Sequence, residues 1–337
     1  MRDQQLDNYR ALVMMYIFFG HVAYWLHDIH EPWLSLVLFA IPMVFFVSGA
    51  SLAVAGTDRG MLPTIKSRLT RVVLPFYVYA VVVIALFSAA TLILPDTTAY
   101  GFSPFKLADY GWREVLSIIL CTDVPGIPNN AHLWFIAPYL ILSCTFPLQT
   151  RLMRKTNRHV YMAACLLLFA AVQAVTHHEL LREVLCYNVF MVGGYLYYRR
   201  AGVGARLLAA AASLLAMCAY VIAGGNFVPM QDHKFPPDWL YVAYGIFMLC
   251  LLSLVLGRVT IPSNRLLRLW NRRGYTIYIY QSIVFLIVQF IGWRSMVRFP
   301  ANLVWLPDTL LVIALSTVLV QVTYPLERYV LGIIRRK

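Results

Sequence analysis

The sequence predicts an all-α polytopic membrane protein with about ten transmembrane helices and with the N- and C-termini cytoplasmic. Three observations predict this fold class. The 337 residues are 61% hydrophobic and only 13% charged, whereas soluble domains are about half apolar and a quarter charged. Apolar runs of about 20 residues recur, a length that crosses a hydrocarbon core about 30 Å thick. Basic residues are distributed unevenly among the connections between these runs.

Ten apolar runs are bounded by charged residues, Pro or Gly. They are residues 9–27, 33–55, 72–94, 131–149, 159–176, 182–199, 206–224, 238–257, 274–292 and 303–331. The last run is the longest, and we expect it to be tilted or to extend beyond the bilayer. Residues 1–337 are therefore predicted to form a single transmembrane domain. Its longest connection, an extracytoplasmic loop at about 95–130, exceeds an ordinary connector and is expected to cap an outward-facing cavity.

The distribution of basic residues predicts the orientation. If the N-terminus is cytoplasmic, the cytoplasmic connections hold 22 Lys and Arg residues and the opposite side holds 6. This bias predicts both termini inside. The net charge of +13 does not indicate a nucleic-acid partner, because the charges form small clusters between apolar runs and no continuous stripe. The expected partner is the lipid bilayer.

Cysteine and histidine patterns do not indicate a metal site. The six cysteines form no CxxC pair, and most lie in apolar runs, where they are expected to behave as small hydrophobic residues. The pairs His27/His30 and His177/His178 occur in short loops without a completed set of ligands. No bound metal is therefore expected.

The first apolar run carries two polar residues that are costly in lipid. In LDNYRALVMMYIFFGHV, Arg10 and His21 are 11 residues apart, which on a helix is three turns plus about 20°, or roughly 16 Å along one face. A charged side chain within a membrane helix costs about 2.5–3.5 kcal/mol. The spacing suits an arginine that meets an anionic group at the cytoplasmic edge and a histidine that acts deeper in the bilayer. Alternatively, Arg10 is an anchor beside Asp7, and His21 is a hydrogen-bonded packing residue.

A second basic cluster lies where the third run begins. In KSRLTRVVLPFYVY, Arg68 and Arg71 are one helical turn apart, a spacing at which guanidinium groups suit phosphates. The preceding segment, FFVSGASLA, contains Ser48, Gly49 and Ser51. Small residues of this kind permit close helix packing or the approach of a ligand to the backbone.

Three further polar positions lie within or beside apolar runs. They are His132 in NNAHLWFIAPY, Tyr278 in YTIYIYQS and Glu327 in QVTYPLERYV. Glu327 precedes Arg328 directly, so a local ion pair is an alternative to a functional role. His132 could equally be an ordinary residue of the membrane interface.

Taken in order, LDNYRALVMMYIFFGHV, FFVSGASLA, RLTRVVLPFYVY, HLWFIAPYL, YTIYIYQS and TYPLER resemble the acyltransferase-3 family of integral membrane acyltransferases, in a stand-alone form without the extra esterase-like domain. The resemblance implies an acyl-CoA-dependent O-acetyltransferase of the bacterial inner membrane. Such an enzyme moves an acetyl group, or another acyl group, from its CoA ester to a hydroxyl of a cell-envelope glycan or its lipid-linked precursor. Acyl-CoA would then be a substrate, and no cofactor would be bound permanently.

The resemblance also implies roles for individual residues. His21 and Arg10 match the catalytic motif, and Arg68 and Arg71, together with Arg10, match the residues that handle the acyl donor. The supporting polar positions would be His132, Tyr278, Glu327 and Ser48. Gln281 stands where the family often has a histidine, so a second proton-transfer role at this position is not expected.

A rival interpretation is a transporter or flippase for a glycolipid or a polar solute. Such a protein would use the buried Arg and His along a translocation path, and about ten helices suit it equally well. The sequence shows no inverted repeat to support this interpretation. Binding of coenzyme A and release of its thiol would distinguish the two classes.

Overall fold

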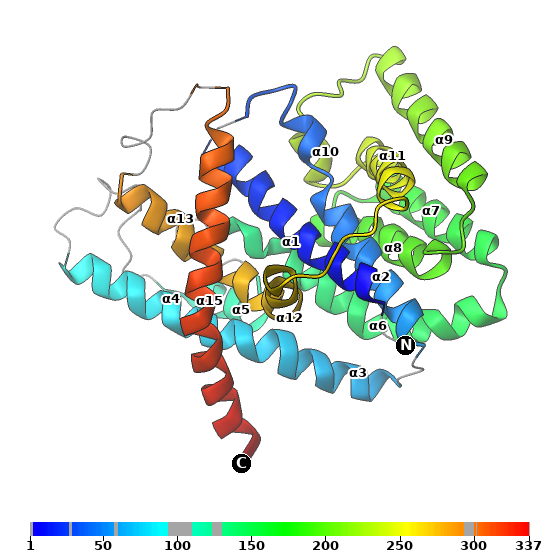
Figure 1. The fold of residues 1–337 in the computed structure, drawn as a ribbon. Coiled ribbons are helices and arrows are strands. Elements are labelled where there is room, and N and C mark those ends of the chain that lie inside the picture. The colour runs from blue at the N-terminus through cyan, green and yellow to red at the C-terminus, as the bar shows by residue number, and fades with distance from the viewer. Residues whose placement is uncertain are drawn as a thin grey trace. The chain divides into compact units, whose positions relative to one another are not determined.

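The computed structural model describes residues 3–26, 29–56, 60–93, 110–122, 130–292, 300 and 302–336 (Figure 1). Within these residues the regular structure is helical, apart from an isolated bridge between Lys234 and Pro237. Lipid offers no hydrogen bonds to a bare backbone, so a helix that satisfies its own backbone groups is the expected structure for each apolar run. The predicted all-α class is confirmed.

Seven helical segments among the described residues are long and apolar enough to cross a membrane. They are Ser35–Ala55, Met61–Ile93, Ala131–Lys155, Arg158–Val175, Val203–Ile222, Trp239–Leu256 and Trp305–Ile333. The other three predicted spans also fall on helices, which are α1 (Gln4–Trp25), α8 (Glu179–Tyr197) and the pair α12 (Arg265–Ile279) and α13 (Gln281–Phe290). A polytopic membrane protein is thus supported, whereas the count of ten and the cytoplasmic termini remain predictions.

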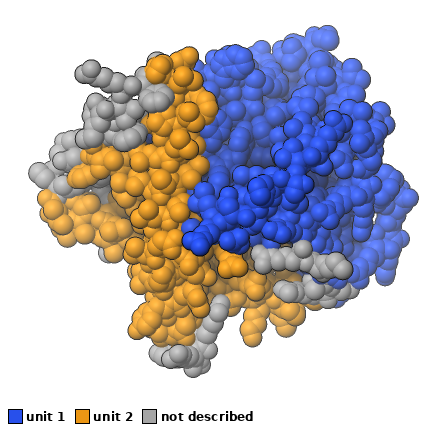
Figure 2. Space-filling view, viewed as in Figure 1, with its two compact units in different colours: residues 1–59, 145–271 blue, residues 60–144, 272–337 orange. Residues whose placement is uncertain are grey.

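The chain divides into two compact units, each built from two stretches of sequence (Figure 2). Unit 1 comprises residues 1–59 and 145–271, and unit 2 comprises residues 60–144 and 272–337. The boundaries fall within α6 (Ile136–Lys155) and α12, so each of these helices contributes to both units.

Unit 1 is centred on a close pair of helices. It contains α1, η1 (Ser35–Val37), α2 (Ala40–Ala55), α7 (Arg158–Val175), α8, α9 (Val203–Ile222), α10 (Met230–Lys234) and α11 (Trp239–Leu256). A Cβ added to Gly49 of α2 would lie 1.8 Å from the Met191 carbonyl oxygen of α8. One added to Gly194 of α8 would lie 1.9 Å from the Phe46 carbonyl oxygen of α2. Gly49 and Gly194 therefore permit the close packing of α2 against α8. Close helix packing is one of the two roles expected for the small residues of FFVSGASLA.

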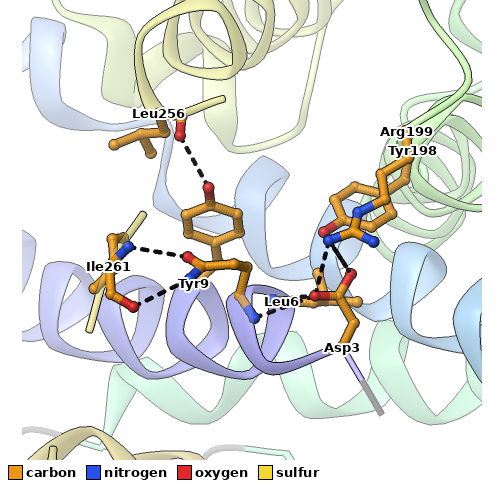
Figure 3. A network of polar contacts seen from close by, with 8 residues as sticks. Asp3, Leu6, Tyr9, Tyr198, Arg199, Leu256 and Ile261 are labelled. Carbon is orange, nitrogen blue, oxygen red and sulfur yellow. Dashed lines mark hydrogen bonds and ion pairs between the residues drawn. The ribbon is translucent and has the colours of Figure 1, made fainter. Parts of the chain in front are cut away.

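The start of α1 is fixed by a polar network within unit 1 (Figure 3). Asp3 caps the helix by accepting from the backbone N–H groups of Gln5 and Leu6. The Asp3 carboxylate also accepts from the Tyr198 hydroxyl at 3.0 Å and pairs with Arg199 at 3.0 Å. These contacts fix the N-terminal end of the helix that carries Arg10 and His21.

Two further contacts attach the same part of α1 to the last residue of α11 and to the segment that follows it (Figure 3). The Gln5 side chain donates to the Ile261 carbonyl at 3.2 Å and accepts from its N–H at 3.1 Å. The Tyr9 hydroxyl donates to the Leu256 carbonyl at 3.0 Å. Backbone groups that helices leave unbonded are thus paired with side chains of α1.

The segment around α10 is held by short polar contacts. The Met230 N–H donates to the Ser35 hydroxyl at 2.8 Å. The two ring nitrogens of His233 lie 2.6 Å from an Asp238 carboxylate oxygen and 2.7 Å from the Asn226 carbonyl oxygen. This segment also carries Lys234, which is half-buried.

Unit 2 contains one long helical run with an irregular turn. The run consists of α3 (Met61–Arg68), the π-turn η2 (Leu69–Val73) and α4 (Leu74–Ile93). In a π-turn the hydrogen bonds skip one more residue than in an α-helix, and such turns are frequent at functional sites. The Tyr275 hydroxyl of α12 donates to the Val72 carbonyl of this turn at 3.0 Å.

The remaining helices of unit 2 pack around this run or follow it. They are α5 (Trp112–Ile119), η5 (Ala131–Phe135), the first part of α6, the end of α12, α13 and α15 (Trp305–Arg336). Helix α15 packs against both α4 and α13.

Candidate active site

Arg10 is held on α1 with part of its guanidinium exposed. Its Nη2 donates to the Ser51 hydroxyl at 2.5 Å, and its Nη1 donates to the Asn271 side-chain oxygen at 3.4 Å. Asp7, one turn earlier, lies 3.8 Å from Nη1, and the Arg10 side chain is 43% exposed. Contacts from α2 and α12 thus orient the planar group, and its exposed donors are oriented before an anion arrives.

His21 lies on the same unbroken helix. Helix α1 runs from Gln4 to Trp25, so the expected separation of three turns between Arg10 and His21 holds. The imidazole stacks on the indole of Trp25, with ring centroids 4.5 Å apart and planes 6° apart. This stacking holds the plane of the imidazole parallel to the indole.

The small residues of α2 have distinct roles. Ser51 holds Arg10 and donates its own proton to the Val47 carbonyl at 2.6 Å. Gly49 permits the close approach to α8. Ser48, the serine expected to support the site, is half-buried and has no hydrogen-bond partner among the residues that the structure describes. The serine that contacts Arg10 is therefore Ser51, three residues from Ser48 on the helix, and a supporting role for Ser48 stays a prediction.

Arg68 and Arg71 have different surroundings in unit 2. The Arg68 Nη1 donates to the Tyr139 hydroxyl at 3.2 Å, and its guanidinium carbon lies 5.5 Å from the centre of the same ring. Its Nε is buried and has no hydrogen-bond partner within the described parts of the chain. Arg71 lies in the π-turn and is exposed. One arginine thus faces the protein and retains an unused donor, and the other is accessible.

A break between two helices forms a second polar cluster in unit 2. Tyr280 separates α12 from α13, and the Ile283 N–H bonds to the Tyr280 carbonyl instead of continuing the α-helical pattern to Ile279. The released Ile279 carbonyl lies 3.4 Å from Nε2 of His132. Because a carbonyl can only accept, Nε2 carries the proton in this contact, and in the neutral ring Nδ1 carries the lone pair.

The structure brings His132 and Tyr278 together, a pairing that no sequence pattern predicts. The Tyr278 hydroxyl donates to the His132 carbonyl, and the two rings pack edge to face at 5.2 Å. Both residues are 1% exposed. A tyrosine beside the helix break therefore holds the backbone of the turn that presents the histidine.

Three residues of this cluster were missed by sequence reasoning. The Tyr79 hydroxyl of α4 donates to the Asn130 side chain and lies 3.0 Å from the Ser282 hydroxyl of α13. All three are buried. All three lie within the quoted segments: Tyr79 ends RLTRVVLPFYVY, Asn130 lies in NNAHLWFIAPY and Ser282 ends YTIYIYQS. The available signal for Asn130 and Ser282 was a polar residue beside or within an apolar run.

Glu327 is buried at 5% exposure, and its carboxylate accepts from the Thr276 hydroxyl at 2.7 Å. Arg328 is exposed, and in the described part of unit 2 the two neighbours form no ion pair. Adjacent residues on a helix point about 100° apart, so one faces the protein interior while the other faces outward. Glu327 therefore bonds to Thr276 of α12 and does not form the local ion pair with Arg328 that was the alternative.

Each of the two units thus holds its own set of charged and titratable groups. Unit 1 presents an oriented guanidinium and a stacked imidazole on one helix face. Unit 2 holds a buried histidine against a helix break, as well as two arginines near a π-turn. In the described residues, no group of three or more His, Cys, Asp or Glu side chains is placed to hold a metal ion. His27, one of the paired histidines, lies outside the described residues.

Comparison with known proteins identifies the family of the chain. No curated protein and no solved structure matches this chain. A family described as an acyltransferase domain, acyltransferase 3, matches residues 3–324. The match includes α1 with Arg10 and His21, the π-turn with Arg71 and the cluster around His132. The chain is a membrane acyltransferase that belongs to the acyltransferase 3 family.

Proposed function

We propose that the protein is an O-acetyltransferase that moves an acetyl group from acetyl-CoA to a hydroxyl of a cell-envelope glycan or its lipid-linked precursor, in a bacterial inner membrane. The observation that carries the proposal is the arrangement on α1. Arg10 is oriented by Ser51 and Asn271 yet remains 43% exposed, and His21 follows three turns later on the same helix.

Arg10 supplies a binding group for an anionic donor. A guanidinium forms charge-assisted, forked hydrogen bonds to phosphate, and its orientation by neighbouring side chains reduces the entropy lost on binding. The phosphates of coenzyme A are suitable anions. We also assign donor binding to Arg68 and Arg71, because Arg68 has an unused buried donor and Arg71 is exposed.

His21 supplies the proton transfer or the nucleophile. As a general base, it takes the proton of the acceptor hydroxyl while the hydroxyl oxygen bonds to the acetyl carbon and the carbon–sulfur bond breaks. The CoA sulfur leaves as a thiolate and takes up a proton. As a nucleophile, His21 first accepts the acetyl group and then passes it to the hydroxyl. The first route requires a ternary complex, and the second gives ping-pong kinetics.

Thiol release tests the assignment of His21. Purified protein is incubated with acetyl-CoA and an envelope glycolipid fraction, and the free thiol is measured for wild type, His21→Ala and His30→Ala. His30 is an exposed histidine outside the helices, so His30→Ala shows whether the loss of a histidine elsewhere in the chain lowers the activity. We expect glycolipid-dependent release that persists in His30→Ala and falls at least about 100-fold in His21→Ala, the usual range for a general base. Full activity of His21→Ala would contradict both routes.

Donor binding is tested separately with the same assay. Arg68→Ala and Arg71→Ala, made singly and together, should raise the KM for acetyl-CoA more than they lower kcat, because they remove binding that is equal in the ground and transition states. Unchanged KM values would remove both arginines from donor binding while leaving the role of His21 intact. A protein that neither binds coenzyme A nor releases thiol would instead support the transporter or flippase alternative.

A further inference from the structure

The segment after α11 and the first part of α12 carry concentrated positive charge. Residues 258–273 hold five arginines, and no Asp or Glu occurs between Asp238 and Asp308. Orientation in a membrane requires positive residues in such a connection, but it does not require them to share one face of a helix. The placement of these arginines on α12 therefore bears on binding as well as on topology.

Three of the arginines form one stripe on α12. Arg265, Arg268 and Arg272 are spaced by three and four residues, which places them within an arc of about 60° around the helix axis. All three are exposed, and their side chains make no hydrogen bond or ion pair with the residues that the structure describes. Trp270, on another face, is fully buried and packs edge to face on Phe18 of α1 at 5.1 Å. Helix α12 thus buries an apolar face and leaves its guanidinium groups available.

Arg10 lies beside this stripe. The Asn271 side-chain oxygen accepts from Nη1 of Arg10 at 3.4 Å. Asn271 is one turn after Arg268 and about 60° from it around the axis of α12, and side chains three residues apart on a helix have Cβ atoms about 5–6 Å apart. An arginine side chain readily spans that distance. The partly exposed guanidinium of Arg10 and that of Arg268 can therefore contact one ligand that carries several anionic groups.

The stripe lies on the side of Arg10 that is away from His21. Around the axis of α12, Asn271 stands between Trp270 and Arg268. Trp270 contacts Phe18, and Asn271 contacts Arg10, which is eight residues, or about 12 Å, nearer to the N-terminal end of α1. Continuing in the same direction from Asn271 to Arg268 leads further from Phe18 and His21. The order along the site is therefore His21, Arg10 and then the arginines of α12.

We propose that Arg268 and Arg265 bind the phosphate on the ribose of coenzyme A, while Arg10 binds its diphosphate. Along an acyl-CoA molecule the thioester comes first, the diphosphate follows the pantetheine arm, and the ribose phosphate is farther still from the thioester, which is the order of the groups in unit 1. Forked guanidinium donors suit phosphate oxygens. Both α12 arginines belong to unit 1 with Arg10. The inference rests on the proposed function, because it takes acyl-CoA as the donor.

Binding of two nucleotides tests this assignment. Isothermal titration calorimetry measures the Kd of the purified protein in detergent for coenzyme A and for dephospho-coenzyme A, which lacks only the ribose phosphate. The variants are Arg268→Gln and Arg265→Gln, made singly and together. Arg200→Gln is the matched control, because Arg200 is an exposed arginine of unit 1 outside α12. Binding is measured without an acceptor, so the result does not depend on the transfer step.

We expect wild type and Arg200→Gln to bind coenzyme A at least about ten-fold more tightly than dephospho-coenzyme A, as hydrogen bonds to a charged group imply. The double variant should bind the two nucleotides equally, and each single variant should reduce the ratio. An unchanged ratio in the double variant would overturn the assignment, as would equal binding of both nucleotides by wild type, and either result would leave the proposed function standing. Wild type that binds neither nucleotide would refute coenzyme A as the donor, and this inference with it. The single variants give the same comparison if the double variant does not fold.

Discussion

Replacing Gly49 by Ala should separate α2 from α8 and destabilise unit 1. The new Cβ would lie 1.8 Å from the Met191 carbonyl oxygen, whereas real Cβ atoms essentially never approach a neighbour within 3.0 Å. The obstacle is backbone and cannot rotate away, so the helices must shift by more than 1 Å. Overpacking of this kind costs about 1–3 kcal/mol. A backbone clash belongs near the upper end, and the better helix propensity of Ala offsets about 0.5–1 kcal/mol. We therefore expect a net loss of about 2 kcal/mol.

Thermal unfolding of the purified protein in detergent, followed by tryptophan fluorescence, measures this loss. Gly20→Ala in α1 is the matched control, because a Cβ at this position meets nothing within 4 Å. The control should unfold at or above the wild-type temperature, and Gly49→Ala should unfold several degrees lower. Gly194→Ala, on the opposite side of the same contact, should match Gly49→Ala. The double variant should lose less than the sum, because both residues report one helix contact. Equal unfolding temperatures for Gly49→Ala and Gly20→Ala would refute the reasoning.

Three further predictions concern individual polar groups. Ser51→Ala removes the 2.5 Å contact that orients the α1 arginine, so it should raise the KM for acetyl-CoA about ten-fold. Ser48→Ala, three residues away, should leave this KM unchanged, and equal effects of the two variants would refute the assignment. Thr276→Val leaves the buried carboxyl of Glu327 without its 2.7 Å hydrogen bond, so the free energy of unfolding should fall by about 1–3 kcal/mol. Thr276→Ser should restore it, and a valine variant as stable as the serine variant would contradict this role. Burial lowers the pKa of Lys234 to about 8, against an opposing effect of a nearby carboxylate. Between pH 8 and the usual lysine pKa of about 10.4, the unfolded chain therefore binds more protons than the folded chain. The contribution of Lys234 to the free energy of unfolding should therefore rise with pH across that window, and the unfolding temperature should rise with it. Lys234→Met should abolish the rise, and an unchanged pH dependence would show that the amine titrates normally when folded.

The sequence by itself determined the class of fold and the arrangement along the first helix. Lipid forces long apolar runs to satisfy their own backbone hydrogen bonds, so hydropathy and length alone place helices in the chain. Helix geometry then relates Arg10 to His21, because both residues lie on one helix whose rise and twist are fixed. The six motifs in order were enough to indicate the family that residues 3–324 match.

Only the tertiary structure decided which polar groups meet. Ser51 rather than Ser48 reaches Arg10, and Thr276 rather than Arg328 contacts Glu327. The physical reason is that these partners lie 41 and 51 residues apart, beyond the reach of any helical period, and side chains three residues apart have quite different neighbours once a second helix packs nearby.

The same limit applies to the helix break at Tyr280 and to α5. YTIYIYQS reads as a continuous apolar helix, yet Tyr280 interrupts it, and the released Ile279 carbonyl finds a partner in His132, which is 147 residues away. Likewise, WREVLSIIL has an amphipathic pattern, but a pattern does not say whether its apolar face meets protein, water or lipid. Local sequence fixes which side chains share a helix face, whereas packing between distant segments decides what that face contacts.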